Sequence, residues 1–126
     1  MKERFLKFSL SFILFLSMFL LASSVHAITE ATVEEIMANK DSYDGKEVAV
    51  SGTVSTPKFK ASRAGKAYMT FPILGDSGDR INILKWGDMK LKPGKKVSVK
   101  GIYRKTMKLG KYTFRDLIEA SKISKD

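Results

Sequence analysis

Hydrophobic and polar residues alternate along most of the chain after Lys46, and a period of two is typical of half-buried β-strands. The pattern predicts five strands, at residues 46–54, 67–74, 80–86, 97–103 and 111–118. In the third of these, Ile81 and Ile83 compete with Leu84 and Trp86 for the core, so the facing of that strand stays open. Pro72 lacks a backbone donor, so part of the second strand is expected at a sheet edge.

Glycine, proline and charged residues separate these strands. Gly75–Asp79 and Leu91–Gly94 are predicted to be turns, while Pro57–Lys66 and Lys105–Gly110 are predicted to be loops. Gly52 lies on the inward side of its strand, where a side chain would block a sharp bend.

A helical period precedes the strands. Thr32 and Glu35 have the spacing of a capping box, with Thr32 as N-cap, and Val33, Ile36 and Met37 follow on one face. A helix over about residues 32–40 is therefore expected, followed by a turn at Asp41–Gly45.

Five strands with inward glycines favour a closed barrel, because an open sheet would leave long unpaired edges. We predict a mainly β protein: a five-stranded OB-fold (Greek-key) barrel over about residues 46–120, with a short N-terminal helix. The connection between strands three and four is too short for the helix often found there.

The first 27 residues have the three parts of a secretory signal: a basic start, an apolar segment at Phe8–Ala22, and small residues at Val25 and Ala27. The apolar segment is shorter than the roughly 20 residues that span a bilayer, which favours cleavage over a retained anchor. The sequence therefore predicts a signal peptide at residues 1–27, an OB-fold domain at residues 28–126, and a periplasmic or secreted protein.

The chain has no cysteine, and its one histidine, His26, lies in the predicted signal. The mature protein then lacks the usual zinc and copper ligands and the commonest general base. We expect no cofactor, no metal site and no enzymatic activity. A nuclease-type OB barrel would need a compact pair of acids beside an arginine, and the sequence shows none.

Positive charge is concentrated in the strand region. Residues 46–115 hold seventeen Lys and Arg against four Asp and Glu, whereas residues 28–45 hold one Lys against five acids. This asymmetry points to a polyanionic partner, namely nucleic acid, an anionic membrane surface or an acidic glycan. The alternative is a lysine-rich surface that serves solubility.

The strand pattern also resembles the OB-fold family that includes tRNA anticodon-binding domains. The resemblance is carried by Val48, Val50, Gly52 and Val54, by Arg63, Gly65, Lys66, Tyr68, Phe71, Leu74, Asp76, Gly78 and Ile81, and by Leu91, Pro93, Gly94, Val97, Val99 and Gly101. It implies oligonucleotide binding on the face of strands two and three and in the loops that join strands one to two and four to five. Anticodon-binding domains belong to cytoplasmic enzymes, so the predicted export signal sets this chain apart from them. In this respect the chain resembles short exported envelope proteins of the same fold.

A single-strand site needs cations along a backbone and exposed aromatic rings for base stacking. The candidate ligand-binding residues are Lys58, Phe59, Lys60, Arg63, Lys66, Tyr68, Lys85, Trp86, Arg104, Lys105, Lys108 and Lys111. Tyr68 is equally compatible with a core position, whereas Trp86 is more often a core or barrel-cap residue than a stacking surface. Phe59 is also compatible with a plug at the open end of the barrel.

The sequence thus predicts an exported OB-fold module that binds single-stranded DNA or RNA, or another polyanion, through a basic groove. The alternative is an envelope-associated module that binds an anionic glycan, a lipid headgroup or a protein partner.

Overall fold

The computed structural model describes residues 27–125, so the predicted signal peptide lies outside the described residues except for Ala27. The elements in chain order are β1 (Thr29–Glu30), α2 (Val33–Ala38), α3 (Lys40–Tyr43), β2 (Glu47–Val54), β3 (Lys58–Ala61), β4 (Ala67–Leu74), β5 (Arg80–Trp86), β6 (Lys96–Leu109) and β7 (Tyr112–Lys125). None of the helices in this part of the chain is long and apolar enough to cross a membrane.

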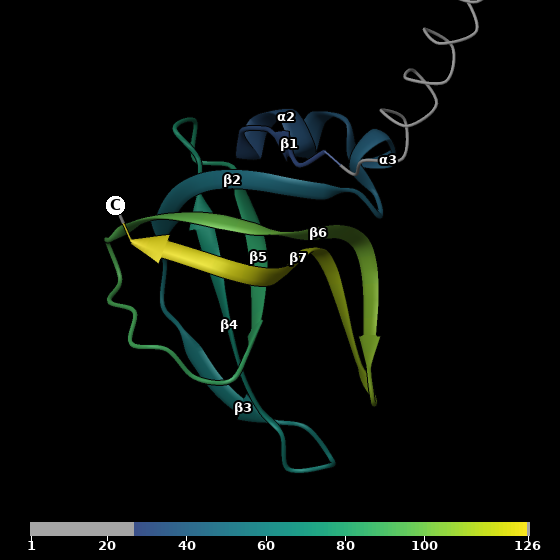
Figure 1. Ribbon diagram of the computed structural model, residues 1–126, viewed down its shortest axis with the longest axis vertical. Helices are drawn as coiled ribbons and strands as arrows, with labels where there is room; N and C mark the ends of the chain where they lie inside the picture. The colour runs from purple at the N-terminus through teal and green to yellow at the C-terminus, as the bar shows by residue number, and fades with distance from the viewer. Residues whose placement is uncertain (1–26, 126) are drawn as a thin grey trace, which may run out of the picture.

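Five strands close into a ring (Figure 1). Strand β2 pairs with β6, β6 with β7, β7 with β5, β5 with β4, and β4 returns to β2. All of these pairings are antiparallel except β5 with β7, which is parallel. This order and its single parallel pair define a five-stranded Greek-key OB barrel, which confirms the predicted fold class. The connection Gly87–Lys95 contains no helix, as expected.

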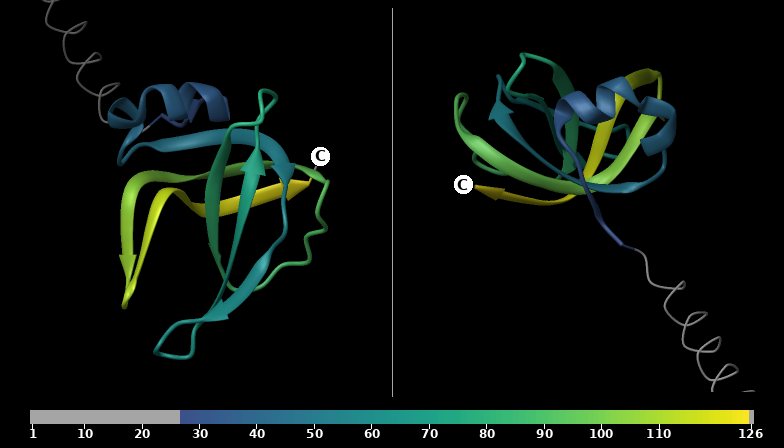
Figure 2. Two further views of the ribbon diagram at one scale, coloured as in Figure 1. Left: turned by 180° about the vertical axis from the view of Figure 1, so that it is seen from behind. Right: turned by 90° about the horizontal axis from the view of Figure 1, so that it is seen from above.

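The two helices lie over one end of the barrel, as the view from above shows (Figure 2). The capping box is confirmed, because the Glu35 N–H donates to Thr32 Oγ1 over 3.0 Å and the Thr32 hydroxyl donates to the Glu35 carboxylate over 3.2 Å. Val33 and Ile36 are fully buried in the barrel core. Such burial stabilises by about 1.5–3 kcal/mol per side chain, which holds α2 on the barrel. The segment predicted as a turn at Asp41–Gly45 begins as the short helix α3, and the turn itself is confined to Asp44 and Gly45.

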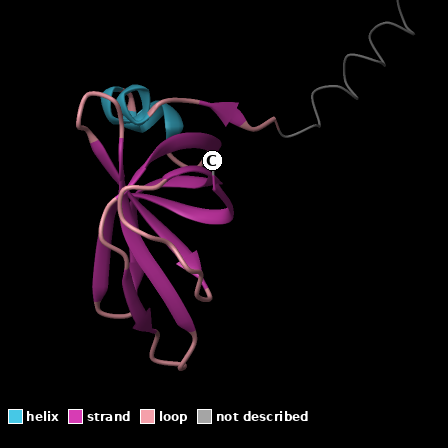
Figure 3. Cartoon of the chain, turned by 90° about the vertical axis from the view of Figure 1, so that its left-hand side faces the viewer, coloured by secondary structure: helices cyan, strands magenta, loops and turns pink. Residues whose placement is uncertain are grey.

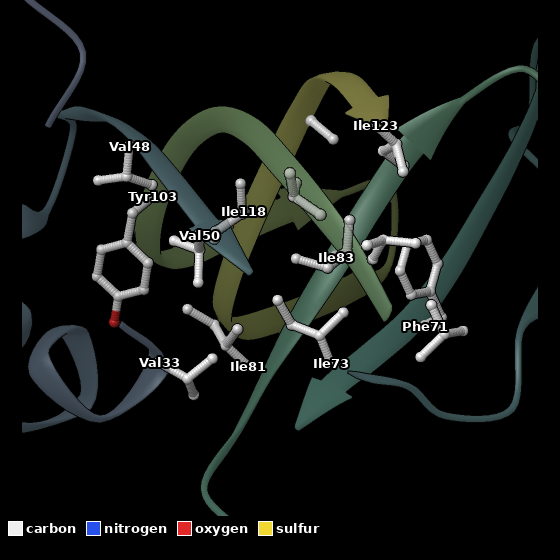
Figure 4. Close-up of a cluster of buried hydrophobic side chains, with 14 of the residues drawn as sticks. Val33, Val48, Val50, Phe71, Ile73, Ile81, Ile83, Tyr103, Ile118 and Ile123 are labelled. Carbon is white, nitrogen blue, oxygen red and sulfur yellow. The ribbon is translucent and has the colours of Figure 1, made fainter. Parts of the chain in front are cut away.

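The barrel interior is filled by alternate residues of every ring strand (Figure 4). Val50, Phe71 and Ile83 are among the side chains that meet there, and Tyr103 points its hydroxyl toward the helices. Ile81 and Ile83 face this core, whereas Leu84 and Trp86 lie on the outer face of β5. This settles the facing of β5. The sequence was ambiguous because both faces of the strand pack against hydrophobic side chains.

Two predicted loops are strands in the structure. Lys58–Ala61 forms β3, which pairs with β4, and β6 continues without a break to Leu109 before the turn at Gly110. Strand β7 also runs seven residues past the predicted end at Ile118. The two loop predictions were wrong for the same reason. The lysine-rich composition suggested that these backbone groups would bond to water, but strand pairing beyond the barrel satisfies them instead.

Pro72 lies where β4 has no strand on one side. Strand β3 pairs with β4 as far as Thr70, and β2 pairs with it from Ile73 onward. The missing N–H of Pro72 therefore breaks no ladder hydrogen bond on that side. The sheet edge expected from Pro72 is therefore local to this position, because β4 has a paired strand on both sides along most of its length.

Two hairpins project from the barrel end opposite the helices (Figure 3). One is β3 with the start of β4, which turns at residues 62–66. The other, which we call the arm, comprises residues 106–115 of β6 and β7 and turns at Gly110 and Lys111. The arm and the β3–β4 hairpin flank the outer face of β4 and β5, which carries some of the predicted ligand-binding residues.

Candidate nucleic-acid interface

A cross-strand row on the outer face of the sheet carries three of the predicted residues. Lys60 of β3 pairs with Tyr68 of β4, and Tyr68 pairs with Trp86 of β5. Directly opposed residues on neighbouring strands present their side chains on the same face. The Tyr68 and Trp86 ring centroids are 5.5 Å apart, and the ring planes are tilted by 59°. The register of the hairpins thus brings a cation and two aromatic rings into one line.

The arm covers the middle of this face with apolar side chains. Tyr68, Leu84 and Leu117 are buried in a second hydrophobic cluster, on which Trp86, Met107, Leu109 and Phe114 pack. Tyr68 is only 2% exposed, so it does not provide the exposed stacking surface that the sequence suggested. Tyr68 lies on the face of β4 opposite the barrel core, because Met69, Phe71 and Ile73 point into that core. The arm, however, turns that outer face into a second core.

Lysine side chains lie over the rings that remain accessible at the rim. Lys66 Nζ lies 4.6 Å from the Trp86 ring centroid, and Lys60 Nζ lies 5.4 Å from that of Tyr112 and 5.8 Å from that of Phe114. Lys111 Nζ lies 5.6 Å from the Tyr112 ring centroid. These six residues, Lys60, Lys66, Lys111, Trp86, Tyr112 and Phe114, are named the lysine–aromatic face. Lys60 reaches from the β3–β4 hairpin to the arm, so the face joins the two.

Tyr112 and Phe114 were missed at the sequence level. Tyr112 is half exposed, at 50%, and Phe114 packs against the second cluster. Their signal was present, since Tyr112 and Phe114 alternate with Thr113 in a segment predicted to be a strand. Which face of that strand meets Lys60 depends on its pairing with residues 106–109 of β6, and those residues were predicted to belong to a loop.

Phe59 and Lys85 lie on the other face of the sheet. Phe59 pairs with Met69, and Met69 pairs with Lys85, so this row points away from Trp86 and toward the barrel interior. The Phe59 ring is nevertheless 62% exposed, so it does not plug the barrel. The sequence placed Lys85 beside Trp86, but adjacent residues of a strand point to opposite faces.

Acidic residues engage two other predicted cations. Lys105 forms an ion pair with Asp41, and its backbone N–H donates to Asp44 Oδ1 over 2.9 Å. Arg104 Nε lies 3.8 Å from Glu119 Oε2. Both residues belong to the bend at the base of the arm, so they act as structural partners there and do not line the lysine–aromatic face.

The remaining predicted cations are exposed and surround the face. Lys58 and Arg63 belong to the β3–β4 hairpin, and Lys108 belongs to the arm. Their positions let them reach a long polyanion that extends past the rings, but they make no contact with the rings themselves.

Asp116 ties the base of the arm to the helices. Its carboxylate accepts a hydrogen bond from the Tyr103 hydroxyl over 3.0 Å and one from Lys40 Nζ over 3.2 Å. Burial raises the pKa of the Tyr103 hydroxyl, and the Asp116 carboxylate raises it further. The hydrogen bond from Lys105 lowers the pKa of Asp41, and the same bond raises the pKa of Lys105. The arm is therefore fixed in place from the helix end.

An open pocket lies elsewhere, on the outer face of β2 and β6 beside α2. Its volume is about 730 Å³, and its lining includes Glu34, Ser51, Gly52, Ser98 and Lys100. Across residues 27–125, no three His, Cys, Asp or Glu side chains converge as metal ligands would. The lysine–aromatic face remains the place where the predicted cations and rings meet.

No protein-family model matches the sequence, and no curated protein matches it. Among solved structures, the chain is similar to the crystal structure of a small single-stranded DNA-binding protein from Streptomyces coelicolor. The sequence identity is 15% and the TM-score is 0.48, and the match covers 66% of this chain and 94% of that chain. The OB-fold assignment rests on the strand order and pairing described above, and nothing about a ligand follows from this match.

Proposed function

We propose that this protein binds single-stranded nucleic acid on the lysine–aromatic face, without catalysing a reaction. The observation that carries the proposal is the placement of Lys66 over Trp86 and of Lys60 and Lys111 over Tyr112. Single-strand sites combine a cationic track with aromatic rings, because every base has a flat face that stacks and every nucleotide has a phosphate. Both components occur here within one face.

The lysines over the rings suggest how a nucleic-acid base could reach an aromatic ring that is covered in the free protein. In the free protein each ammonium group covers a ring by a cation–π contact, which is worth about 0.5–1 kcal/mol at an exposed site. A base that stacks on the ring contributes roughly 1–3 kcal/mol. A base can therefore displace the ammonium group, and the released lysine then pairs with a phosphate of the same strand.

We further propose that the protein is exported, on the strength of the signal-like segment at residues 1–27. The alternative function is an envelope module that binds an anionic glycan or a protein partner. An acidic glycan would use the same lysines, but it offers no flat aromatic face to Trp86 or Tyr112.

The test uses Trp86 as a reporter, because it is the only tryptophan of the chain. Titration with a single-stranded oligonucleotide should quench Trp86 fluorescence, because a stacked base contacts the indole directly. Tyr112→Ala should weaken oligonucleotide binding by about tenfold, which is about 1.4 kcal/mol. Phe59→Ala removes an exposed ring from the opposite face and should leave the affinity unchanged.

Heparin separates the two functions. It should bind with little quenching and should be insensitive to Tyr112→Ala. Equal losses for oligonucleotide and heparin in Tyr112→Ala would contradict nucleic-acid binding and support the glycan. An oligonucleotide that binds without changing Trp86 fluorescence would show that the face is wrongly chosen.

A further inference from the structure

Phe59 has no role in the barrel or on the lysine–aromatic face. It is the most exposed of the large hydrophobic side chains among residues 27–125, at 62%. Its cross-strand partner Met69 is fully buried, yet the Phe59 ring itself lies open. A single exposed hydrophobic side chain is ordinary on a protein surface, so the meaning of Phe59 depends on the residues around it.

The strand that carries Phe59 is amphipathic. In β3 the sequence Lys58-Phe59-Lys60-Ala61 alternates, so the lysines share one face while Phe59 and Ala61 share the other. Ala61 pairs with Ala67, which is also exposed and extends the apolar side. This apolar side points away from Trp86, so a strand stacked on Trp86 does not cover it. Strand β3 also ends the sheet order, which leaves its outer edge accessible in the described residues.

The charge around this hairpin is entirely positive. No aspartate or glutamate occurs between Glu47 and Asp76, whereas Lys58, Lys60, Arg63 and Lys66 all do. A partner must therefore be anionic around the edge and apolar beneath Phe59. An anionic lipid surface has both properties, because acidic headgroups overlie hydrocarbon and lysine side chains extend back to the phosphates.

We propose that the β3–β4 hairpin is an anchor that inserts Phe59 into the interface of an anionic membrane. A membrane interface needs no matching shape, which suits a single exposed ring on a narrow hairpin. The hairpin also projects from the end of the molecule farthest from the helices, so it can reach a flat surface without obstruction (Figures 1 and 3). This inference does not depend on nucleic-acid binding, because Phe59 lies on the opposite face of the hairpin from Trp86, although Lys60 and Lys66 contribute charge to both surfaces.

The test pairs two fluorescent reporters on the two faces. Phe59→Trp in a Trp86→Phe background should show a blue shift with phosphatidylcholine vesicles that contain about one-third phosphatidylglycerol, and none with phosphatidylcholine alone. Trp86 of the native protein should change little with the same vesicles. In vesicle sedimentation, Phe59→Ala should lower the partition coefficient by about tenfold, and Phe59→Leu should restore most of it.

Tyr112→Ala is the matched control, because it removes an exposed ring from the arm and should keep vesicle binding near the native level. A Phe59→Ala protein that sediments as well as the native protein would reduce the interaction to charge alone and overturn the anchor. Absence of vesicle binding at low salt would overturn it as well. Loss of Trp86 quenching by oligonucleotide would count only against the proposed function.

Discussion

Two glycines let neighbouring strands approach more closely than any side chain would permit. At Gly101 an added Cβ would lie 2.2 Å from the Glu119 carbonyl oxygen and 2.8 Å from the Ala120 Cα. At Gly52 it would lie 2.8 Å from the Leu74 carbonyl oxygen. Gly101 adjoins the β-bulge between β6 and β7, and bulges bend strands and increase their twist. The expected inward position of Gly52 is confirmed, since alternation fixes it without knowledge of the partner strand.

Gly101→Ala should destabilise the protein by about 3 kcal/mol, because the methyl group would meet backbone atoms that cannot rotate aside. Thermal unfolding should show a Tm lower by about 10 °C or more. Gly94→Ala is the comparison. Gly94 has a φ of 87° but no heavy atom near the added Cβ, so the loss there should be nearer about 1 kcal/mol. Equal losses at the two positions would contradict the close-approach explanation.

At the scale of secondary-structure elements, the arm is the part of the fold that local sequence patterns did not predict. Strands β4 and β5 were predicted at Ala67–Leu74 and Arg80–Trp86, and both have these bounds in the structure. Each is bounded by turn residues, and Met69, Phe71 and Ile73 alternate with polar or less buried positions in β4. The arm has alternation too, at Met107 and Leu109, but four positive charges from Arg104 to Lys111 suggested a solvated loop. Its order depends on contacts with β4, β5 and α3 that are distant in the sequence.

Helix α3 holds the base of the arm through charge. Because Lys105 lowers the pKa of Asp41, the ion pair adds stability above the ordinary carboxyl pKa of about 3.9, and this contribution is lost as the pH falls through the lower folded-state value. Asp41→Asn should therefore lower the Tm at neutral pH and make the further loss on acidification smaller than in the native protein.

The measurement is a Tm series from neutral pH to about pH 3. Asp88→Asn removes the same charge from the Gly87–Lys95 connection, where Lys105 is not a partner, and should keep the native acid response. If Asp41→Asn lost as much stability on acidification as the native protein, the pair between α3 and the arm would not contribute.

At the scale of the whole molecule, charge is separated between the two ends of the barrel. Acidic side chains gather at the helix end and its neighbouring β4–β5 turn, whereas the two hairpins are basic (Figure 1). Glu34 joins α2 to the β4–β5 turn at the acidic end. Its carboxylate accepts hydrogen bonds from the Ser77 backbone N–H over 3.0 Å and from the Ser77 hydroxyl over 2.8 Å. The sequence shows only that some segments are acidic and others basic, whereas the fold places these segments at opposite ends of the barrel.

A basic end predicts a binding strength that falls steeply with salt, because each phosphate neutralised by a lysine releases a counterion. The fold adds a distinction that net charge cannot make. Lys60, Lys66 and Lys111 lie on the lysine–aromatic face, whereas Lys96, Lys100 and Lys122 are exposed on the outer face of β2, β6 and β7. Replacing either set by glutamine lowers the net charge by the same amount.

If a single strand follows the lysine–aromatic face, the triple variant of Lys60, Lys66 and Lys111 should flatten the plot of log affinity against log salt by about 2, at roughly 0.7 per lost contact. The triple variant of Lys96, Lys100 and Lys122 should leave that slope unchanged and lower the affinity only slightly, through the weaker long-range field. Fluorescence anisotropy of a labelled oligonucleotide at several salt concentrations measures both slopes, and melting curves of both variants exclude unfolding. The same flattening in the two variants would mean that strands bind by net charge over the whole surface. A flattening confined to the second variant would move the site to the outer face of β2, β6 and β7, where serines alternate with the lysines and no ring is available for stacking.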